Sequence, residues 1–403
     1  MIPYKLGLKN RIFKNSFIFR SIFSRYFESR MSGAVVSLYI NRIIQQVAGG
    51  LLALFLPVFL LQKYNSINLV LVWFLVGYIL YVFLSAWGAI IATRISFKNA
   101  LILSVFSGVC YYVCFYFFDK NILLFSILTI IFLNIDRMFY WVPYHSGFAK
   151  FTDRKSRGKT IAILASSAAL IGAIIPILSG LIITYYGFNV LFLIVIIIYA
   201  ISAFPFFTMP SINEYYTFSY WQTWKILLHP RDRRLLFTYM ADGAENMIGV
   251  VIWPIFIWQL LNGDYKAVGM VFSLVVLVTI LGRLIFGDYA DRFNKKKLIK
   301  YGTFLYSIGW IVKIFVQTGF QIFVVSAYHN LALAAMRTPY DILVYEKTAD
   351  AGHYVDEYSV LREMSLNIGR IFIVLFLLFL FNFFGLNYAF VFAAIAVLIF
   401  NLL

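Results

Sequence analysis

The chain has 403 residues, of which 62% are hydrophobic and only 13% are charged, and its mean hydropathy is +0.85. Soluble proteins have about a quarter charged residues, so this composition excludes a soluble α/β protein and predicts a protein with many membrane-spanning segments. The formal net charge of +17 would suit a nucleic-acid partner only if the basic residues were gathered on one binding surface.

Residues 1–31 combine seven basic residues and five phenylalanines with a single acidic residue, Glu28. This composition suits either a basic cytoplasmic segment lying on an anionic membrane surface or a disordered basic tail. No continuous apolar run precedes a small-residue cleavage site, so we expect no cleavable signal peptide.

Twelve apolar stretches follow, each long enough to cross about 30 Å of hydrocarbon. They lack the alternation of barrel strands, and their backbone polar groups must be satisfied within lipid, so we expect an all-α membrane protein. The predicted crossings are 33–62, 68–93, 99–118, 121–149, 160–184, 188–208, 234–261, 267–290, 298–317, 320–346, 358–382 and 386–403.

The basic residues between the crossings lie almost entirely on one side of the predicted membrane. The amino-terminal segment and the even-numbered turns hold nearly all of them, whereas the odd-numbered turns hold only Lys63, Lys120 and Lys266. Positively charged loops stay in the cytoplasm, so the asymmetry predicts that both termini are cytoplasmic and that the protein spans the plasma membrane. Topology thus explains the net charge, and nucleic acid is rejected as a partner.

The crossings divide into two halves of six, 32–209 and 234–403, joined by a cytoplasmic amphipathic linker at 210–233. The two halves repeat one another at a separation of about 197 residues, as expected for parallel six-crossing repeats. The matching pairs are Pro57 and Pro254, Pro143 and Pro339, and Gly88 and Gly287.

The turn after the eighth crossing carries a short charged motif. Its sequence is Gly287-x-x-x-Asp291-Arg292-x-x-Lys295-Lys296. The motif resembles the loop motif of the major facilitator superfamily, Gly-x-x-x-Asp-Arg/Lys-x-Gly-x-Arg/Lys, with Asn294 where the family usually has glycine. The resemblance implies twelve helices in two pseudo-symmetric halves around a central cavity, and secondary transport by alternating access.

By the same resemblance, Gly287, Asp288, Asp291 and Arg292 are expected to form a gate. In the family the motif's aspartate bridges to a basic residue and to the cytoplasmic end of the eleventh helix, and thereby stabilises the outward-open state. Arg292 and Arg362 are the basic partners that this chain offers to Asp291. A turn with a purely topological role is the alternative.

Charged residues inside the crossings are energetically costly, so their positions are informative. They concentrate on the first, fourth, seventh and tenth crossings, with Arg283 and Arg370 on the eighth and eleventh. In the superfamily the first four of these surround the cavity, while the third, sixth, ninth and twelfth face lipid. The interior of that second group carries one charge, Lys313 on the ninth crossing, which we expect to reach water from near the helix end.

We therefore predict a substrate and proton site near the membrane midplane and an inner gate towards the cytoplasm. A carboxylate away from water can exchange a proton near neutral pH unless an arginine keeps it ionised, so proton coupling through Glu245 or Asp136 is our hypothesis. Ion pairs that only hold the halves together are the alternative for the gate. The midplane group is Asp136, Glu245 and Arg370; the gate group is Arg42, Asp242, Asp341 and His145; Arg137, Asn246 and Arg337 share helix faces with them.

The fifth crossing contains a segment from Gly172 to Gly180 with Pro176 inside it. The segment resembles the antiporter motif of the superfamily, Gly-Pro-x-x-Gly-Gly, from which Ile175 and Ser179 depart. A proline kink with small packing residues is an equally good interpretation.

Aromatic residues and charges of both signs on the cavity faces suit a small organic, amphipathic solute. The runner-up is a lipid or lysolipid translocator on the same fold, and a third alternative is a non-transporting membrane receptor. An enzyme is not expected, because the four histidines are scattered and no loop could form a catalytic domain. Cys110 and Cys114 suit packing within one helix better than a disulfide or a metal. We expect no cofactor, a monomer, and the solute, protons and membrane lipids as partners.

Overall fold

The computed structural model describes residues 33–151, 157–210, 216–229, 233–290, 295–349 and 355–402. Within these ranges nearly every residue is helical, and no strand occurs. The predicted segment 1–31 and the motif residues Asp291 and Arg292 lie outside the described residues. The side chains of Arg283, Gly287, Asp288 and Asp341 also fall outside the described part.

Ten helices among the described residues are long and apolar enough to cross a membrane. One of them, Ser166–Phe207, contains two predicted crossings, because the chain turns back at Gly187. Gly187 has a φ of 78°, a left-handed backbone conformation that glycine adopts without strain. The shorter apolar helix Leu386–Leu402 supplies the last crossing. The described helices therefore account for twelve crossings, and the predicted all-α fold is confirmed.

The first half contains six crossings, of which the first is formed by two helices in succession. Its elements are α2 (Gly33–Ala53) and α3 (Leu56–Tyr64), α4 (Ile67–Ile95), α5 (Phe97–Tyr116) with the short turn η1 (Phe118–Lys120), α6 (Ile122–Phe151), α7 (Arg157–Ile201) and α8 (Phe204–Phe207).

The second half repeats this arrangement after the linker helix α9 (Tyr220–Leu227). Its elements are α10 (Arg233–Met247), the π-helical segment η3 (Ile248–Ile252) and α11 (Trp253–Leu260), α12 (Tyr265–Ala290), α13 (Lys295–Val312) with the turn η4 (Lys313–Phe315), α14 (Gly319–Ala349), α15 (Val355–Leu380), η5 (Leu386–Tyr388), α16 (Ala389–Leu398) and η6 (Ile399–Leu402).

The first crossing of each half is interrupted at the same place. In the first half α2 ends before a two-residue turn, and Pro57 stands in the first turn of α3. In the second half α10 passes through the wider η3 segment, and Pro254 stands in the first turn of α11. Proline lacks a backbone N–H and is favoured in the first turn of a helix, where that N–H has no helical partner, so both prolines fit a helix that begins again just after the interruption.

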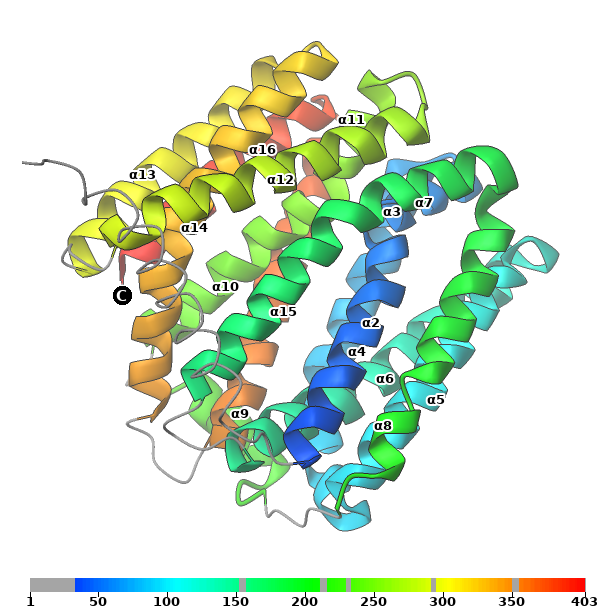
Figure 1. Cartoon of the computed structure of the whole chain (residues 1–403), viewed down its shortest axis with the longest axis vertical. Coiled ribbons are helices and arrows are strands. Elements are labelled where there is room, and N and C mark those ends of the chain that lie inside the picture. Colours follow the sequence, from blue (N-terminus) through cyan, green and yellow to red (C-terminus); the bar gives the residue numbers. More distant parts are fainter. Residues whose placement is uncertain are drawn as a thin grey trace, which may run out of the picture.

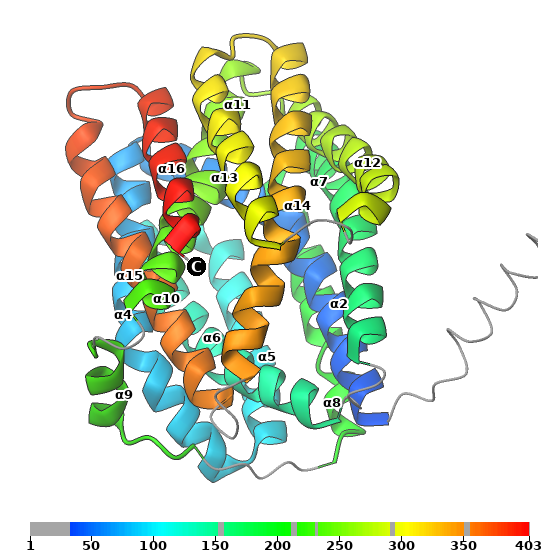
Figure 2. The same cartoon turned by 90° about the vertical axis from the view of Figure 1, so that its left-hand side faces the viewer.

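The linker helix α9 lies against the ends of α4 and α15 (Figure 2). A capping box between Ser219 and Gln222 begins the helix. Its aromatic face packs on α4, where the ring of Tyr220 lies 5.2 Å from that of Trp87. Trp221 is 72% exposed on the other face, as expected of a helix at a membrane surface. We call this end of the bundle the linker side.

Two helix pairs join the halves: α7 packs along α12, and α4 packs along α15 (Figure 1). Glycines allow the close approach of α7 and α12, because a Cβ atom on Gly180 would overlap the carbonyl oxygen of Tyr265. A Cβ atom on Gly269 would likewise overlap the carbonyl oxygen of Pro176. The Gly172–Gly180 segment thus has a packing role between the halves.

Aromatic contacts close the side of the bundle opposite the linker. Tyr265, at the start of α12, packs edge-on against Phe55, with 5.7 Å between ring centroids. It also packs edge-on against Phe188 of α7 at 5.6 Å. The halves therefore meet on this side through side chains as well as backbone.

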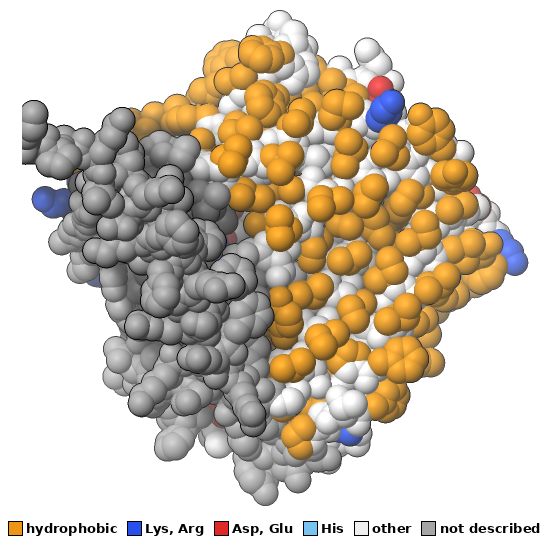
Figure 3. Space-filling view, in the orientation of Figure 1, with side chains coloured by type: hydrophobic (Ala, Val, Ile, Leu, Met, Phe, Trp, Pro, Cys, Tyr) orange, Lys and Arg blue, Asp and Glu red, His pale blue; other side chains and the backbone are white. Residues whose placement is uncertain are grey.

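Large hydrophobic side chains cover the outer surface of the described bundle. Figure 3 shows them spread over the described part of one face, with charged side chains only at its margins. Phe106 on α5 and Phe304 on α13 are among the most exposed. An apolar outer surface of this extent suits contact with lipid rather than water.

Candidate functional site

Asp242 and Arg337 form an ion pair within the second half. Two guanidinium nitrogens of Arg337, on α14, donate to the two carboxylate oxygens of Asp242, on α10, at 2.7 and 3.0 Å. Asp242 is only 5% exposed. The two-point contact joins the seventh and tenth crossings of one half.

Glu245 lies one turn further along α10 and has a different kind of partner. The hydroxyl of Tyr306, on α13, donates to the carboxylate of Glu245 at 2.6 Å, and Glu245 is 7% exposed. Among the described residues no lysine or arginine forms an ion pair with it. The carboxylate therefore points into the second half, towards an outer helix, and is held by a hydroxyl.

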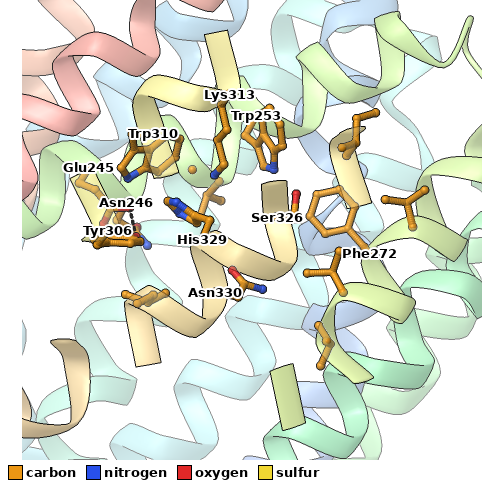
Figure 4. A pocket seen from close by; sticks show the side chains of 17 residues that line it. Glu245, Asn246, Trp253, Phe272, Tyr306, Trp310, Lys313, Ser326, His329 and Asn330 are labelled. Carbon is orange, nitrogen blue, oxygen red and sulfur yellow. Dashed lines mark hydrogen bonds between the residues drawn. The ribbon is translucent and has the colours of Figure 1, made fainter. Parts of the chain in front are cut away.

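A pocket of about 200 Å³ lies beside Glu245, between α10, α12, α13 and α14 (Figure 4). Its walls carry the rings of Trp253, Phe272, Tyr306 and Trp310. Polar groups enter it from several helices. These are Glu245, Asn246, Lys313, Ser326, His329 and Asn330.

Lys313 is buried in this pocket, so our expectation that it reaches water is wrong. Its side chain is 2% exposed, and its ammonium nitrogen lies 3.7 Å from the ring centroid of Trp310 and 4.5 Å from that of Trp253. α13 ends one residue earlier, and the following tight turn directs Lys313 into the bundle while Phe315 faces outward. Trp310 stands three residues before Lys313, on the same helix face, which is the signal that could have revealed the contact.

Asp136, in the first half, also has a tyrosine partner. The hydroxyl of Tyr199, in the last part of α7, lies 3.1 Å from each carboxylate oxygen of Asp136, on α6. Tyr112 of α5 packs against Tyr199 with 5.2 Å between ring centroids. Asp136, like Glu245, is thus held by a tyrosine from an outer crossing of its own half.

Arg42 and His145 gather around one tryptophan in the first half. The guanidinium of Arg42, on α2, lies 4.9 Å from the ring centroid of Trp141, on α6. The ring of His145 lies 5.7 Å from Trp141 at an interplanar angle of 20°. Arg362 of α15 interacts electrostatically with His145, so these side chains face the second half on the linker side.

Arg370 is the predicted site residue that contacts both halves. From α15 it donates to Asn246 and to Asn367, each at 3.1 Å. Its guanidinium also lies 5.4 Å from the ring centroid of Tyr78, on α4 in the first half. Arg137 acts electrostatically on Tyr78 as well, so two arginines from different halves converge near this tyrosine.

The structure thus sorts the predicted residues into separate groups. Asp242 and Arg337 pair, Glu245 and Asn246 line the pocket, Asp136 lies inside the first half, and Arg370 bridges the halves. The sequence analysis missed Tyr199, Tyr306, Trp310, Lys313 and His329. Four of them come from the sixth and ninth crossings, where a polar or aromatic polar residue within an outer crossing is the signal that could have marked them, and His329 comes from the tenth.

Comparisons with known proteins agree with this architecture. A family model described as Major Facilitator Superfamily matches residues 235–403. A solved structure, described as the crystal structure of D-xylose-proton symporter, superposes with a TM-score of 0.64 over 94% of this chain and 95% of the other. The identity is 12%, so that likeness concerns the fold. No curated protein matches the chain by sequence.

The second half of the chain, residues 235–403, thus matches the family model of the major facilitator superfamily, and the chain as a whole shares the fold of the symporter. The chain is an integral, multi-pass membrane transporter rather than an enzyme, as expected from the sequence.

Proposed function

We propose that the chain carries a small organic, amphipathic solute across the membrane by alternating access, and that Glu245 and Asp136 couple transport to protons. The observation that carries this proposal is the contrast between Glu245 and Asp242. The two carboxylates stand one turn apart on α10, yet a tyrosine holds one and an arginine holds the other.

This contrast bears directly on proton exchange. Protonating Asp242 would break its two-point contact with Arg337, whereas protonating Glu245 breaks no ion pair. A buried carboxylate with a hydroxyl partner can therefore take up and release a proton at little structural expense. Asp136, which Tyr199 holds in the first half, has the same freedom.

Alternating access is supported by how the halves meet. Aromatic rings and glycine-mediated backbone contacts close the side opposite the linker. On the linker side Arg362 acts electrostatically on His145, and within the described part of the chain it forms an ion pair with Glu363 at 3.8 Å. The proposed gate formed by Gly287, Asp288, Asp291 and Arg292 would engage Arg362 there when the halves rock the other way.

The proposed setting follows from the charge asymmetry and the outer surface. Both termini are placed on the cytoplasmic side of the plasma membrane, and a monomer contacts lipid through its apolar exterior. The D-xylose-proton symporter couples, by its name, a sugar to protons. That precedent supports a proton-coupled solute on this fold.

The test is uptake into proteoliposomes that contain the purified protein. Radiolabelled carboxylates, amino acids and sugars are screened with and without an inward proton gradient. We expect one solute class to accumulate with the gradient, and we expect Glu245→Gln and Asp136→Asn to lose the pH dependence. Asp119→Asn is the matched control, because that carboxylate is 61% exposed and pairs with Lys63 at the surface.

If the two buried variants keep the pH dependence of the parent, proton coupling through them is wrong. If no solute is taken up under either condition, the transport proposal itself fails.

A further inference from the structure

We infer that the pocket beside Glu245 binds a small aromatic carboxylate, whose anionic group contacts Lys313. This inference names the substrate class for the proposed function and rests on it. Four features of the pocket carry it: a buried cation, an unpaired polar side chain, aromatic walls of the right size, and a carboxylate that can balance the charge.

The buried cation is Lys313. It forms no ion pair with any carboxylate in the described part of the chain, although its side chain is 2% exposed. The faces of Trp253 and Trp310 offer it partial compensation, since aromatic faces attract cations. Glu245 acts on it electrostatically from beyond ion-pair distance, so no carboxylate in the described part is in direct contact with the ammonium. A charge removed from water without such a contact is unfavourable, and charged residues inside membranes mark ligand sites.

A second, independent observation is the hydroxyl of Ser326. Its oxygen is fully buried and has no hydrogen-bond partner among the described residues, yet it lines the pocket (Figure 4). The side chains of His329 and Asn330 line the same wall of α14. Buried polar groups are normally hydrogen-bonded, so an unpaired hydroxyl in a pocket that also holds a lysine indicates a polar ligand group.

The size and the walls of the pocket define the rest of the ligand. A cavity of roughly 150 Å³ holds a benzene molecule. The pocket has about 200 Å³, so it accommodates one such ring together with a carboxylate. The rings of Trp253, Phe272, Tyr306 and Trp310 enclose it, and aromatic rings prefer to pack against one another.

Glu245 balances the charge when the anion binds. Tyr306, Asp242, Arg337 and Lys313 are the titratable or charged groups that act on it. Bringing a carboxylate next to Lys313 adds one negative charge to the pocket. A proton from bulk water on Glu245 removes one, so anion and proton are carried together in a one-to-one ratio.

Residues at the rim of the pocket connect ligand binding to the contact between the two halves. Asn246 and Val250 are exposed at the rim of the pocket. Asn246 accepts a hydrogen bond from Arg370, which lies on Tyr78 of the other half. A ligand that displaces Asn246 would thereby change the contact between the halves.

The test is equilibrium binding of radiolabelled benzoate to the purified full-length protein in lipid nanodiscs. Unlabelled benzamide and benzylamine serve as neutral and cationic competitors of the same shape. We expect saturable binding of benzoate with no competition by either analogue at equal concentration. We expect Lys313→Met to weaken binding more than tenfold, Lys313→Arg to retain part of it, and Ser326→Ala to weaken it severalfold.

Lys120→Met is the matched control. Lys120 lies in η1, the counterpart of η4, with its ammonium 4.5 Å from the ring centroid of Phe117, but it is exposed. This variant should bind benzoate like the parent. Lys313→Met replaces a buried charge with an apolar chain of similar length and should fold; Ser326→Ala tests the site separately.

Several results would overturn the inference: absence of benzoate binding, equal competition by benzamide, or unchanged binding by Lys313→Met. Uptake assays separate this failure from failure of the proposed function. Gradient-driven uptake of other solutes without benzoate binding would support the proposed transport function and contradict the anion site. Lys313-dependent benzoate binding without uptake would support the site and contradict transport.

Discussion

The two halves share a scaffold but bury their charged groups differently. Each half holds a carboxylate against a tyrosine from an outer crossing, Asp136 with Tyr199 and Glu245 with Tyr306. The second half also buries Lys313 beside a pocket, whereas Lys120, which lies at the end of the third crossing in the first half, is exposed. The two carboxylates stand on crossings that the repeat does not relate, the fourth and the seventh, so repetition of the fold does not by itself explain why both have a tyrosine partner.

The largest expected difference between the halves concerns their arginines. Arg337→Met leaves Asp242 buried and unpaired, which should destabilise the protein by about 3–5 kcal/mol. Arg42→Met removes contacts with aromatic rings and a hydrogen bond with Tyr140, but no ion pair among the described residues, and should lose about 0.5–2 kcal/mol. Thermal unfolding in detergent, followed by tryptophan fluorescence, measures both. Equal losses of stability in the two variants would show that the ion pair between Arg337 and Asp242 contributes no more than the aromatic contacts of Arg42.

The tyrosine–carboxylate contacts should behave alike in the two halves. Tyr306→Phe and Tyr199→Phe each remove the donor to a carboxylate, buried in Glu245 and partly buried in Asp136, and should destabilise by about 1–3 kcal/mol. Tyr328→Phe is the control, since its hydroxyl bonds to the carbonyl of Leu305 at the surface. A double variant with Glu245→Gln should show coupling to Tyr306 of about 0.5–3 kcal/mol. Independent effects of the two changes would rule out the contact as we describe it.

The smallest expected effect lies where the halves meet. Gly180→Ala places a methyl group against the backbone of α12 and should destabilise by about 1–2 kcal/mol. Gly172→Ala on the same helix meets only a methyl group of Val276 at 3.7 Å. It should be neutral or stabilising by up to about 1 kcal/mol. If the two alanines behave alike in thermal unfolding, the close approach of α7 and α12 is not as described.

Much of the architecture could be predicted from the sequence. Hydropathy gave the crossings, and the pair Pro57 and Pro254 revealed the repeat, because proline breaks both helices at one place. The direction of each carboxylate could not be predicted. Helical spacing shows which residues share a face, but not how the helix is rotated in the bundle.

The tyrosine partners of the two carboxylates could not be predicted either, because they depend on how distant helices pack. Tyr199 and Tyr306 lie 63 and 61 residues from their carboxylates and on crossings expected to face lipid. Lys313 follows the end of α13, where a single tight turn decides whether a side chain reaches water or the bundle interior. Such choices depend on packing between distant helices, which a single sequence does not display.

Infrared difference spectroscopy between two pH values tests the central claim most directly, because it detects protonated carboxyl groups without a known solute. The purified protein in lipid nanodiscs should show buried carboxyl bands that appear as pH falls. One band should vanish in Glu245→Gln and another in Asp136→Asn, while Asp242→Asn should leave both in place. Bands that persist in the first two variants, or that depend on Asp242 instead, would contradict the account.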